Sequence, residues 1–114
     1  MLKLINLEKK FGNFTAVNKI NLKINKGELF GFLGPNGAGK TTTIKMIAGL
    51  LSPSNVNIFL DNTDVWKNPI ESKMKIGYIP DQPFLYDKLS GREFLYFSGG
   101  IYNLSKNIIR NKIN

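Results

Sequence analysis

One short segment carries residues whose types and spacing suit the binding of phosphate. Residues 34–41 read Gly-Pro-Asn-Gly-Ala-Gly-Lys-Thr and match the pattern G-x-x-x-x-G-K-[ST]. Its glycines allow backbone dihedral angles closed to other residues and let amide N–H groups approach a phosphate without a Cβ in the way. Lys40 adds a mobile charge for β- and γ-phosphates, Thr41 offers a hydroxyl to Mg²⁺, and Thr42 can donate to an α-phosphate oxygen. The segment therefore predicts a nucleotide site.

The sequence on either side predicts the elements that must position this segment. Residues 29–33 read Leu-Phe-Gly-Phe-Leu, and a run that is apolar on both faces is typical of a covered strand in a parallel sheet. After Lys40, apolar residues recur at the spacing of one buried helix face: Ile44, Ile47, Ala48 and Leu51. The first turn of that helix offers free N–H donors and partial positive charge to an anion. A glycine-rich turn that happens to hold a lysine is the alternative, and the flanking elements favour the nucleotide site.

Alternating apolar residues predict an antiparallel β layer in the N-terminal part. Residues 2–7 and 15–25 alternate between apolar and polar positions, as half-buried strands do. Lys26-Gly27 then makes a turn. Residues 56–60 alternate as another strand, which the turn Asp61-Asn62 closes, and asparagine tolerates the left-handed conformation that such a turn can need.

The rest of the chain predicts three helix starts and one further strand. Asn68-Pro69-Ile70-Glu71 combines an N-cap residue, proline at the first helical position and glutamate at the third. Ile76-Gly77-Tyr78-Ile79 is expected to form a strand that Pro80 ends. Ser90-Gly91-Arg92-Glu93 repeats the capping-box arrangement, and Ser105 can cap a last helix.

Composition excludes several classes of site. The 114 residues include neither cysteine nor histidine, which rules out disulfides, zinc sites built on Cys or His, thiol nucleophiles and a Ser-His-Asp triad. The net charge is +8, but the lysines are scattered, so no nucleic-acid partner is expected. No apolar run approaches the roughly 20 residues of a membrane-spanning helix, and the start MLKLINLEKK is not a secretion signal. We therefore expect a cytoplasmic location.

Residues 32–42 resemble the Walker A segment of the ATP-binding cassette (ABC) ATPases, whose sequence is more specific than the general phosphate-binding pattern. Lys10-Phe11-Gly12 resembles the A-loop of that family, where an aromatic ring stacks on adenine. Residues 76–93 resemble the Q-loop region and the start of the helical subdomain. That stretch is most similar to cassettes of bacterial drug- or ion-exporting systems.

The resemblance implies an α/β fold: a partial P-loop NTPase core, an N-terminal antiparallel β layer and the start of a helical subdomain. It divides residues 1–114 into 1–80, the β layer and P-loop core, and 81–114, the Q-loop and helical part. The implied cofactors are ATP and Mg²⁺. The implied partners are a transmembrane permease subunit or domain and a second cassette, with the protein peripheral at the inner face of the membrane.

The same resemblance assigns the site residues. Phe11 would stack on adenine, Lys40 would be the catalytic cation and Thr41 would hold Mg²⁺. The nucleotide would be wrapped by Gly34, Pro35, Asn36, Gly37, Ala38, Gly39, Lys40, Thr41 and Thr42. The Q-loop glutamine of the family falls at Asp81, with Gln82 one residue later. Either residue could serve as a Mg²⁺ ligand, and Asp81 could equally be a solvated loop carboxylate.

Several family motifs are missing. Ser98-Gly99-Gly100 lacks the partners that would make it the signature, no run of four apolar residues ends in aspartate, and no switch histidine exists. The chain therefore resembles the N-terminal half of a cassette and is expected to be inactive alone, with exposed strand edges and poor solubility. Two alternatives stay open: a non-catalytic nucleotide-binding fragment, and a soluble cassette of translation or DNA repair.

Overall fold

The computed structural model describes residues 1–55 and 57–113, so the predicted strand position at Val56 lies outside the described residues. The chain divides into two compact units, Met1–Tyr78 and Ile79–Asn114. Each unit is described below by itself.

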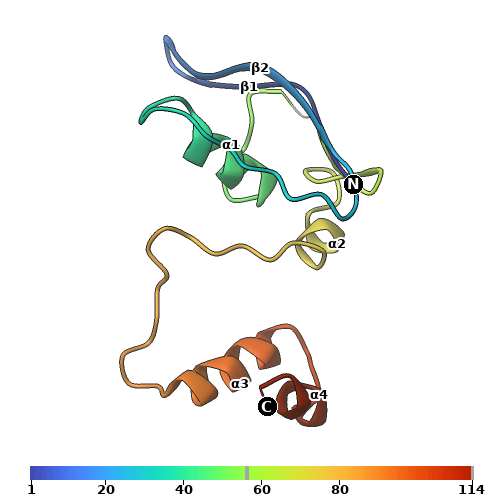
Figure 1. Ribbon diagram of the computed structural model, residues 1–114, viewed down its shortest axis with the longest axis vertical. Coiled ribbons are helices and arrows are strands. Elements are labelled where there is room, and N and C mark those ends of the chain that lie inside the picture. Colours follow the sequence, from blue (N-terminus) through green and yellow to red (C-terminus); the bar gives the residue numbers. More distant parts are fainter. Residues whose placement is uncertain (56, 114) are drawn as a thin grey trace. The chain divides into compact units, whose positions relative to one another are not determined.

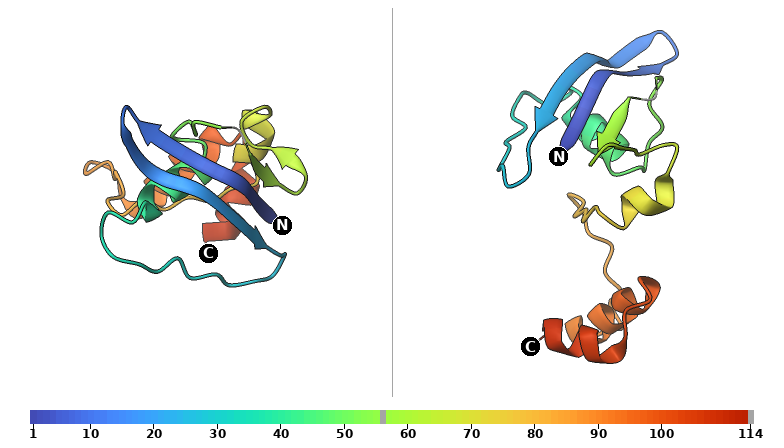
Figure 2. Two further views of the ribbon diagram at one scale, coloured as in Figure 1. Left: turned by 90° about the horizontal axis from the view of Figure 1, so that it is seen from above. Right: turned by 90° about the vertical axis from the view of Figure 1, so that its right-hand side faces the viewer.

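An antiparallel sheet forms the frame of the first unit. Its described strands are β1 (Leu2–Phe11), β2 (Phe14–Ile24), β3 (Ile58–Leu60) and β4 (Thr63–Asp64). They lie in the order β2-β1-β3-β4, and every neighbouring pair is antiparallel (Figures 1 and 2). The antiparallel N-terminal layer that the alternating residues predict is therefore confirmed.

A bulge lets β1 bury residues that simple alternation would place on opposite faces. Leu4 and Leu7 are both buried, although they are three positions apart and side chains in a regular strand alternate. The pairing register with β2 shifts between these two residues, and Asn6 adopts a φ of 47° there. The extra residue of a bulge restores one face, so both leucines contribute to the same core.

The core of the first unit lies between the sheet and α1 (Lys40–Ile47). It consists of the buried side chains Leu4, Leu7, Val17, Met46, Ile58 and Val65. From α1, Thr43 and Met46 are fully buried, whereas Ile44 is 42% exposed. The predicted buried stripe is therefore wrong at Ile44. The sheet covers only one face of α1, and that face carries Thr43 and Met46.

The helix also ends earlier than its apolar periodicity predicts. Gly49 adopts a φ of 69°, its N–H donates to the Met46 carbonyl, and the Leu50 N–H donates to the Lys45 carbonyl. These two bonds form a Schellman motif, which satisfies the last free carbonyls and stops the helix. Leu51 therefore lies beyond the helix, although it still packs against the core.

Two predicted strands are not formed. Residues 29–33 and 76–79 are irregular, and Leu29 and Leu33 are almost fully exposed. A parallel strand needs hydrogen-bonded neighbours on its edges and cover on both faces. The described strands of the sheet are all antiparallel, and none of them pairs with either segment. The apolar residues of these two segments therefore have no neighbouring strand with which to form a parallel sheet.

Most short-range predictions around the remaining elements of the first unit are confirmed. The turn after β3 holds Asn62 at a φ of 67°, and Gly27 adopts a φ of 84° in the turn after β2. The helix α2 (Pro69–Lys73) begins after Asn68, with proline at its start, as predicted. The predicted capping by Asn68 is wrong, because its side chain makes no capping hydrogen bond and the Glu71 carboxylate accepts from Thr63 and Lys75 instead. Sequence signals that act over a few residues therefore specify this part of the backbone.

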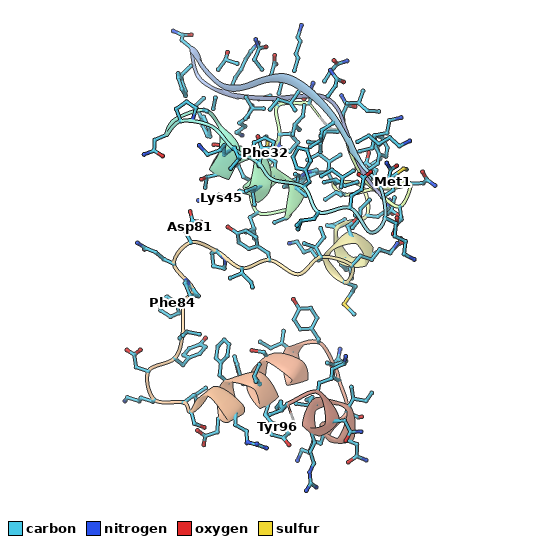
Figure 3. The ribbon with its side chains drawn as sticks, in the orientation of Figure 1. Met1, Phe32, Lys45, Asp81, Phe84 and Tyr96 are labelled. Carbon is cyan, nitrogen blue, oxygen red and sulfur yellow. The ribbon has the colours of Figure 1, made fainter. Side chains whose placement is uncertain are left out.

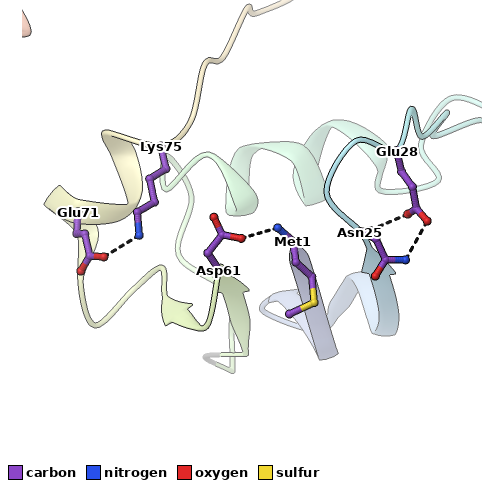
Figure 4. Close-up of polar contacts among 6 residues, drawn as sticks. All are labelled: Met1, Asn25, Glu28, Asp61, Glu71 and Lys75. Carbon is purple, nitrogen blue, oxygen red and sulfur yellow. Dashed lines mark hydrogen bonds and ion pairs between the residues drawn. The ribbon is translucent and has the colours of Figure 1, made fainter.

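Polar contacts at the surface hold the ends of these elements together. Figure 4 shows three of them: Met1 with Asp61, Lys75 with Glu71, and Asn25 with Glu28. In each pair the hydrogen bond is the main cause that lowers the pKa of the carboxyl below its ordinary value. The first contact ties the start of β1 to the turn after β3.

Among its described residues the second unit contains two helices, α3 (Gly91–Ile101) and α4 (Lys106–Ile113). The predicted capping box is confirmed, because the Ser90 hydroxyl accepts from the Glu93 N–H while the Glu93 carboxylate accepts from the Ser90 N–H. The two helices approach closely at Gly99, where an added Cβ would lie 2.6 Å from Ile109 Cδ1. The small residue near the end of α3 therefore makes room for the one buried side chain of α4.

Candidate functional site

The glycine-rich segment forms a loop that leads directly into α1. Residues 34–39 have no regular secondary structure, and Gly39 is the N-cap residue of the helix. Gly37 and Gly39 adopt φ values of 82° and 80°, a region that strongly favours glycine. The backbone shape of the loop therefore depends on glycine at both positions.

Gly39 is required for a second reason, because the loop lies against β2. A Cβ at this position would lie 2.4 Å from the Ala16 carbonyl oxygen and 3.1 Å from Val17 Cγ2. The Gly39 carbonyl in turn accepts from the Thr43 N–H at 2.8 Å and from the Thr43 hydroxyl at 2.9 Å. The junction of loop and helix is thus fixed between β2 on one side and the first turn of α1 on the other.

The loop and the start of α1 present positive charge and hydrogen-bond donors. Lys40 Nζ donates to the carbonyl oxygens of Gly34 and Pro35, each at 2.5 Å, so the ammonium lies over the loop. The first turn of α1 contains no acidic residue, and no side chain caps it. Because the first N–H groups of a helix have no acceptor within the helix, this end of α1 suits an anion such as a phosphate.

A cavity of about 290 Å³ joins this loop to the tip of the β1–β2 hairpin. Its lining residues are Phe11, Phe14, Ala16, Asn36, Gly37, Gly39, Lys40, Thr41 and Thr42. The remaining residues of the predicted site form the loop without lining the cavity: Gly34 and Pro35 accept from Lys40, and the Ala38 N–H donates to the Pro35 carbonyl. The structure therefore brings Phe11 together with the glycine-rich segment, although 23 positions separate it from the first glycine of that segment.

Phe11 is held at the hairpin tip with part of its ring free. The residue pairs with Phe14 across the turn, and its side chain is 48% exposed. Lys9 Nζ lies 5.0 Å from the ring centroid and donates to the Ser52 carbonyl at 2.6 Å. A ring placed in this way can stack on a planar base.

Sequence reasoning missed Phe14 and Ala16 as lining residues. A two-residue turn at Gly12 and Asn13 places the flanking residues directly opposite each other, which was a usable signal for Phe14. Ala16 has no such signal, because only the packing of the loop against β2 brings it to the cavity.

Asp81 and Gln82 belong to the second unit. Both are exposed and lie on the irregular segment before α3, on which Figure 3 labels Asp81 and Phe84. Within residues 1–55 and 57–113, no group of three or more His, Cys, Asp or Glu residues could hold a metal ion. The role of these two residues as Mg²⁺ ligands stays a prediction.

A larger cavity, of about 650 Å³, lies in the second unit. Residues 84–89 and Phe97 line it, and its surface is mainly apolar. It contains neither a glycine-rich loop nor a helix N-terminus. The smaller cavity is therefore the better candidate for a phosphate ligand, despite its size.

No helix among the described residues has the length and apolar character needed to cross a bilayer.

Comparison with known proteins gives consistent matches. The linearmycin resistance ATP-binding protein LnrL of Bacillus subtilis (strain 168) is 43% identical over 105 residues, which cover 92% of this chain and 34% of that protein. A solved ATP-binding subunit of an ABC transporter has a TM-score of 0.81 at 30% identity, over 93% of this chain and 44% of that one. The dimeric structure of MJ0796, a bacterial ABC transporter cassette, has a TM-score of 0.78 at 27% identity, over 97% of this chain and 53% of that one. The chain thus spans about a third to a half of the length of these relatives.

A protein-family model described as ABC transporter matches residues 17–113. This range includes the glycine-rich loop, α1 and both helices of the second unit. The fold likeness agrees with the partial P-loop NTPase core expected from the Walker A segment. The chain therefore belongs to the ABC transporter family.

Proposed function

We propose that this chain is the ATP-binding part of an ABC transporter ATP-binding subunit, which couples ATP binding and hydrolysis to transport by a membrane permease. ATPases of this family bind ATP, generally with Mg²⁺. The observation that carries the proposal is a single cavity lined by an aromatic ring, Phe11, and by the residues of the glycine-rich loop and the start of α1. Such a cavity suits a ligand with a planar base at one end and phosphates at the other.

Each group of the site has a chemical role in this proposal. Phe11 stacks on the adenine ring, and the loop N–H groups together with the first turn of α1 bind phosphate oxygens. Lys40 exchanges its two carbonyl partners for β- and γ-phosphate oxygens, which gives it hydrogen bonds in which both partners are charged. Thr42 donates to the α-phosphate.

The proposed Mg²⁺ site has few charged protein ligands. Thr41, in the first turn of α1, is the proposed Mg²⁺ ligand. Asp81 or Gln82, which the family resemblance assigns to the Q-loop, stays a predicted further ligand. A bound Mg²⁺ would neutralise charge on the β- and γ-phosphates. A hydroxyl and one carboxylate or amide oxygen fit this ion, because Mg²⁺ usually keeps several waters and binds through one or two protein ligands plus substrate phosphates.

Hydrolysis and transport are proposed for the assembled protein. The sequence lacks the signature, Walker B and switch histidine, so we propose nucleotide binding for this chain and turnover only in a complete pair of cassettes. A relative whose title describes a dimeric cassette supports a second cassette as partner, and a relative named for linearmycin resistance supports an exporter. The permease would hold the protein at the inner face of the membrane.

Calorimetry with the 114-residue chain and MgATP tests the proposal. Substitution Lys40→Ala removes charge-assisted hydrogen bonds to phosphate and should weaken binding by about 10- to 100-fold. Lys45→Ala is the matched control, because Lys45 is an exposed lysine on the same helix that does not line the cavity. No heat of binding for the unsubstituted chain, or equal affinities for the two variants, would refute the assignment.

Phosphate release measured on the same samples separates the two open alternatives. Turnover that Lys40→Ala abolishes would show a catalytic chain. Binding without turnover would favour the non-catalytic reading, in which hydrolysis depends on residues that this sequence does not contain.

A further inference from the structure

Phe14 is an exposed aromatic residue beside the nucleotide cavity, and no part of the core accounts for it. Its side chain is 63% exposed, whereas an aromatic ring gains stability by burial. It is the first residue of β2 and lines the cavity together with Phe11. A ring that lines a cavity while contributing little to folding is a candidate for ligand contact.

The hairpin register places the two rings on one face. Phe11 and Phe14 are Cα partners at the end of the β1–β2 ladder, and side chains directly opposite each other in an antiparallel pair lie on the same side of the sheet. The turn between them consists of two residues and begins with Gly12 at a φ of 55°. The short turn fixes the spacing of the two rings.

The two rings at this end of the cavity have no aromatic partner among the described residues. Neither Phe11 nor Phe14 belongs to any of the close ring pairs found among the described aromatic residues. Lys9 Nζ lies over one face of Phe11, so at most one face of that ring is available to a base. One face covers only one part of a planar base, and Phe14 supplies a second apolar surface for it.

The cavity is divided into an apolar end and a polar end. The side chains of Phe11, Phe14 and Ala16 carry no hydrogen-bonding group, whereas the polar lining comes from the loop and α1: Asn36, Lys40, Thr41 and Thr42. The apolar end can hold a base by stacking and van der Waals contact but not by side-chain hydrogen bonds. This division suits a nucleotide better than an inorganic polyphosphate.

We propose that Phe14 is a second base-binding residue, which holds the base of the nucleotide together with Phe11 while the loop holds the phosphates. This inference rests on the proposed function, because it assumes that a nucleotide occupies the cavity. It assigns to Phe14 a contribution to affinity that depends on the base and not on the phosphates.

The test compares two ligands, MgATP and magnesium tripolyphosphate, by calorimetry on the 114-residue chain. Phe14→Ala should weaken MgATP binding by about 5- to 150-fold, the range expected for loss of one base–aromatic contact, and should leave tripolyphosphate binding unchanged. Phe14→Tyr should restore MgATP affinity, because the ring is kept. Phe84→Ala is the matched control, since Phe84 is a strongly exposed phenylalanine that does not line this cavity.

The outcomes separate this inference from the function on which it rests. If the unsubstituted chain binds both ligands and Phe14→Ala changes neither affinity, the role of Phe14 is refuted and the nucleotide site stands. Equal weakening of both ligands would also refute it, because a structural effect on the loop would then be the cause. If the unsubstituted chain binds neither ligand, the proposed function fails and this inference fails with it.

Discussion

The close approach of Gly39 to β2 provides a direct test of how the glycine-rich loop is held. A Cβ added at Gly39 would lie 2.4 Å from the Ala16 carbonyl oxygen. Real Cβ atoms essentially never come within 3.0 Å of such an atom, and a backbone carbonyl cannot rotate away as a side chain can. The substitution Gly39→Ala must therefore push the loop and β2 apart.

The expected loss of stability has two parts. The left-handed φ of 80° costs a residue with a side chain about 1–2 kcal/mol. Forcing extra volume into a packed contact typically costs a further 1–3 kcal/mol, about the cost of overpacking a core. Gly37→Ala is the matched control, because Gly37 has a φ of 82° but no atom within 4 Å of its Cβ position. It should lose only the conformational part.

Urea denaturation monitored by tryptophan fluorescence measures the difference in stability between the two variants. Trp66 is the single tryptophan and packs against the core of the first unit, so its signal reports this unit. We expect Gly39→Ala to lower the free energy of unfolding by about 1–3 kcal/mol more than Gly37→Ala. Equal losses for the two variants would refute the close packing of the loop on β2, and with it our account of how the cavity is shaped.

Three further outcomes follow from the packing and the surface contacts. Met46→Ala should lower the free energy of unfolding by about 2–5 kcal/mol in the same urea assay, because it empties a fully buried position. Ile44→Ala, at an exposed position, should lower it by less than about 1 kcal/mol. The reverse order would show that the stripe expected from periodicity is the buried one. Ser90→Ala removes the hydroxyl that caps α3 at Glu93 and should reduce helix stability by about 1 kcal/mol, seen as lost ellipticity at 222 nm in thermal melts monitored by circular dichroism; an unchanged melt would contradict the capping role. The pKa of Asp61 is lowered in the folded state by a hydrogen bond from the amino-terminal ammonium. This contact therefore stabilises the fold above pH about 4, and its contribution is lost as the pH falls through the folded-state pKa. Asp61→Asn should flatten the acid limb of a stability–pH profile, and an unaltered limb would rule the contact out as a source of acid sensitivity.

The conformation of the glycine-rich loop could be predicted from the sequence because its causes are local. Glycine is needed where the backbone adopts positive φ, as at Gly37 and Gly39, and one lysine beside a helix start supplies the charge. The capping box at Ser90 and the turn at Asn62 have the same character, since each depends on neighbours a few residues away. Alternation was enough to predict the antiparallel layer, although not the bulge that aligns Leu4 with Leu7.

Contacts between distant residues decided the rest. Residues 29–33 have the composition of a buried strand, but a strand exists only where neighbouring strands pair with it, and the described sheet offers none. The buried face of α1 depends on which surface it meets, so Met46 rather than Ile44 enters the core.

The site shows the same division. The loop consists of consecutive residues, so the sequence by itself determined the loop and the family to which its residues point. The shape of the cavity around that loop depends on Ala16 meeting Gly39 and on Phe14 lying opposite Phe11. Only the tertiary structure decided these approaches, because they arise from strand register and close packing between segments that no local pattern connects.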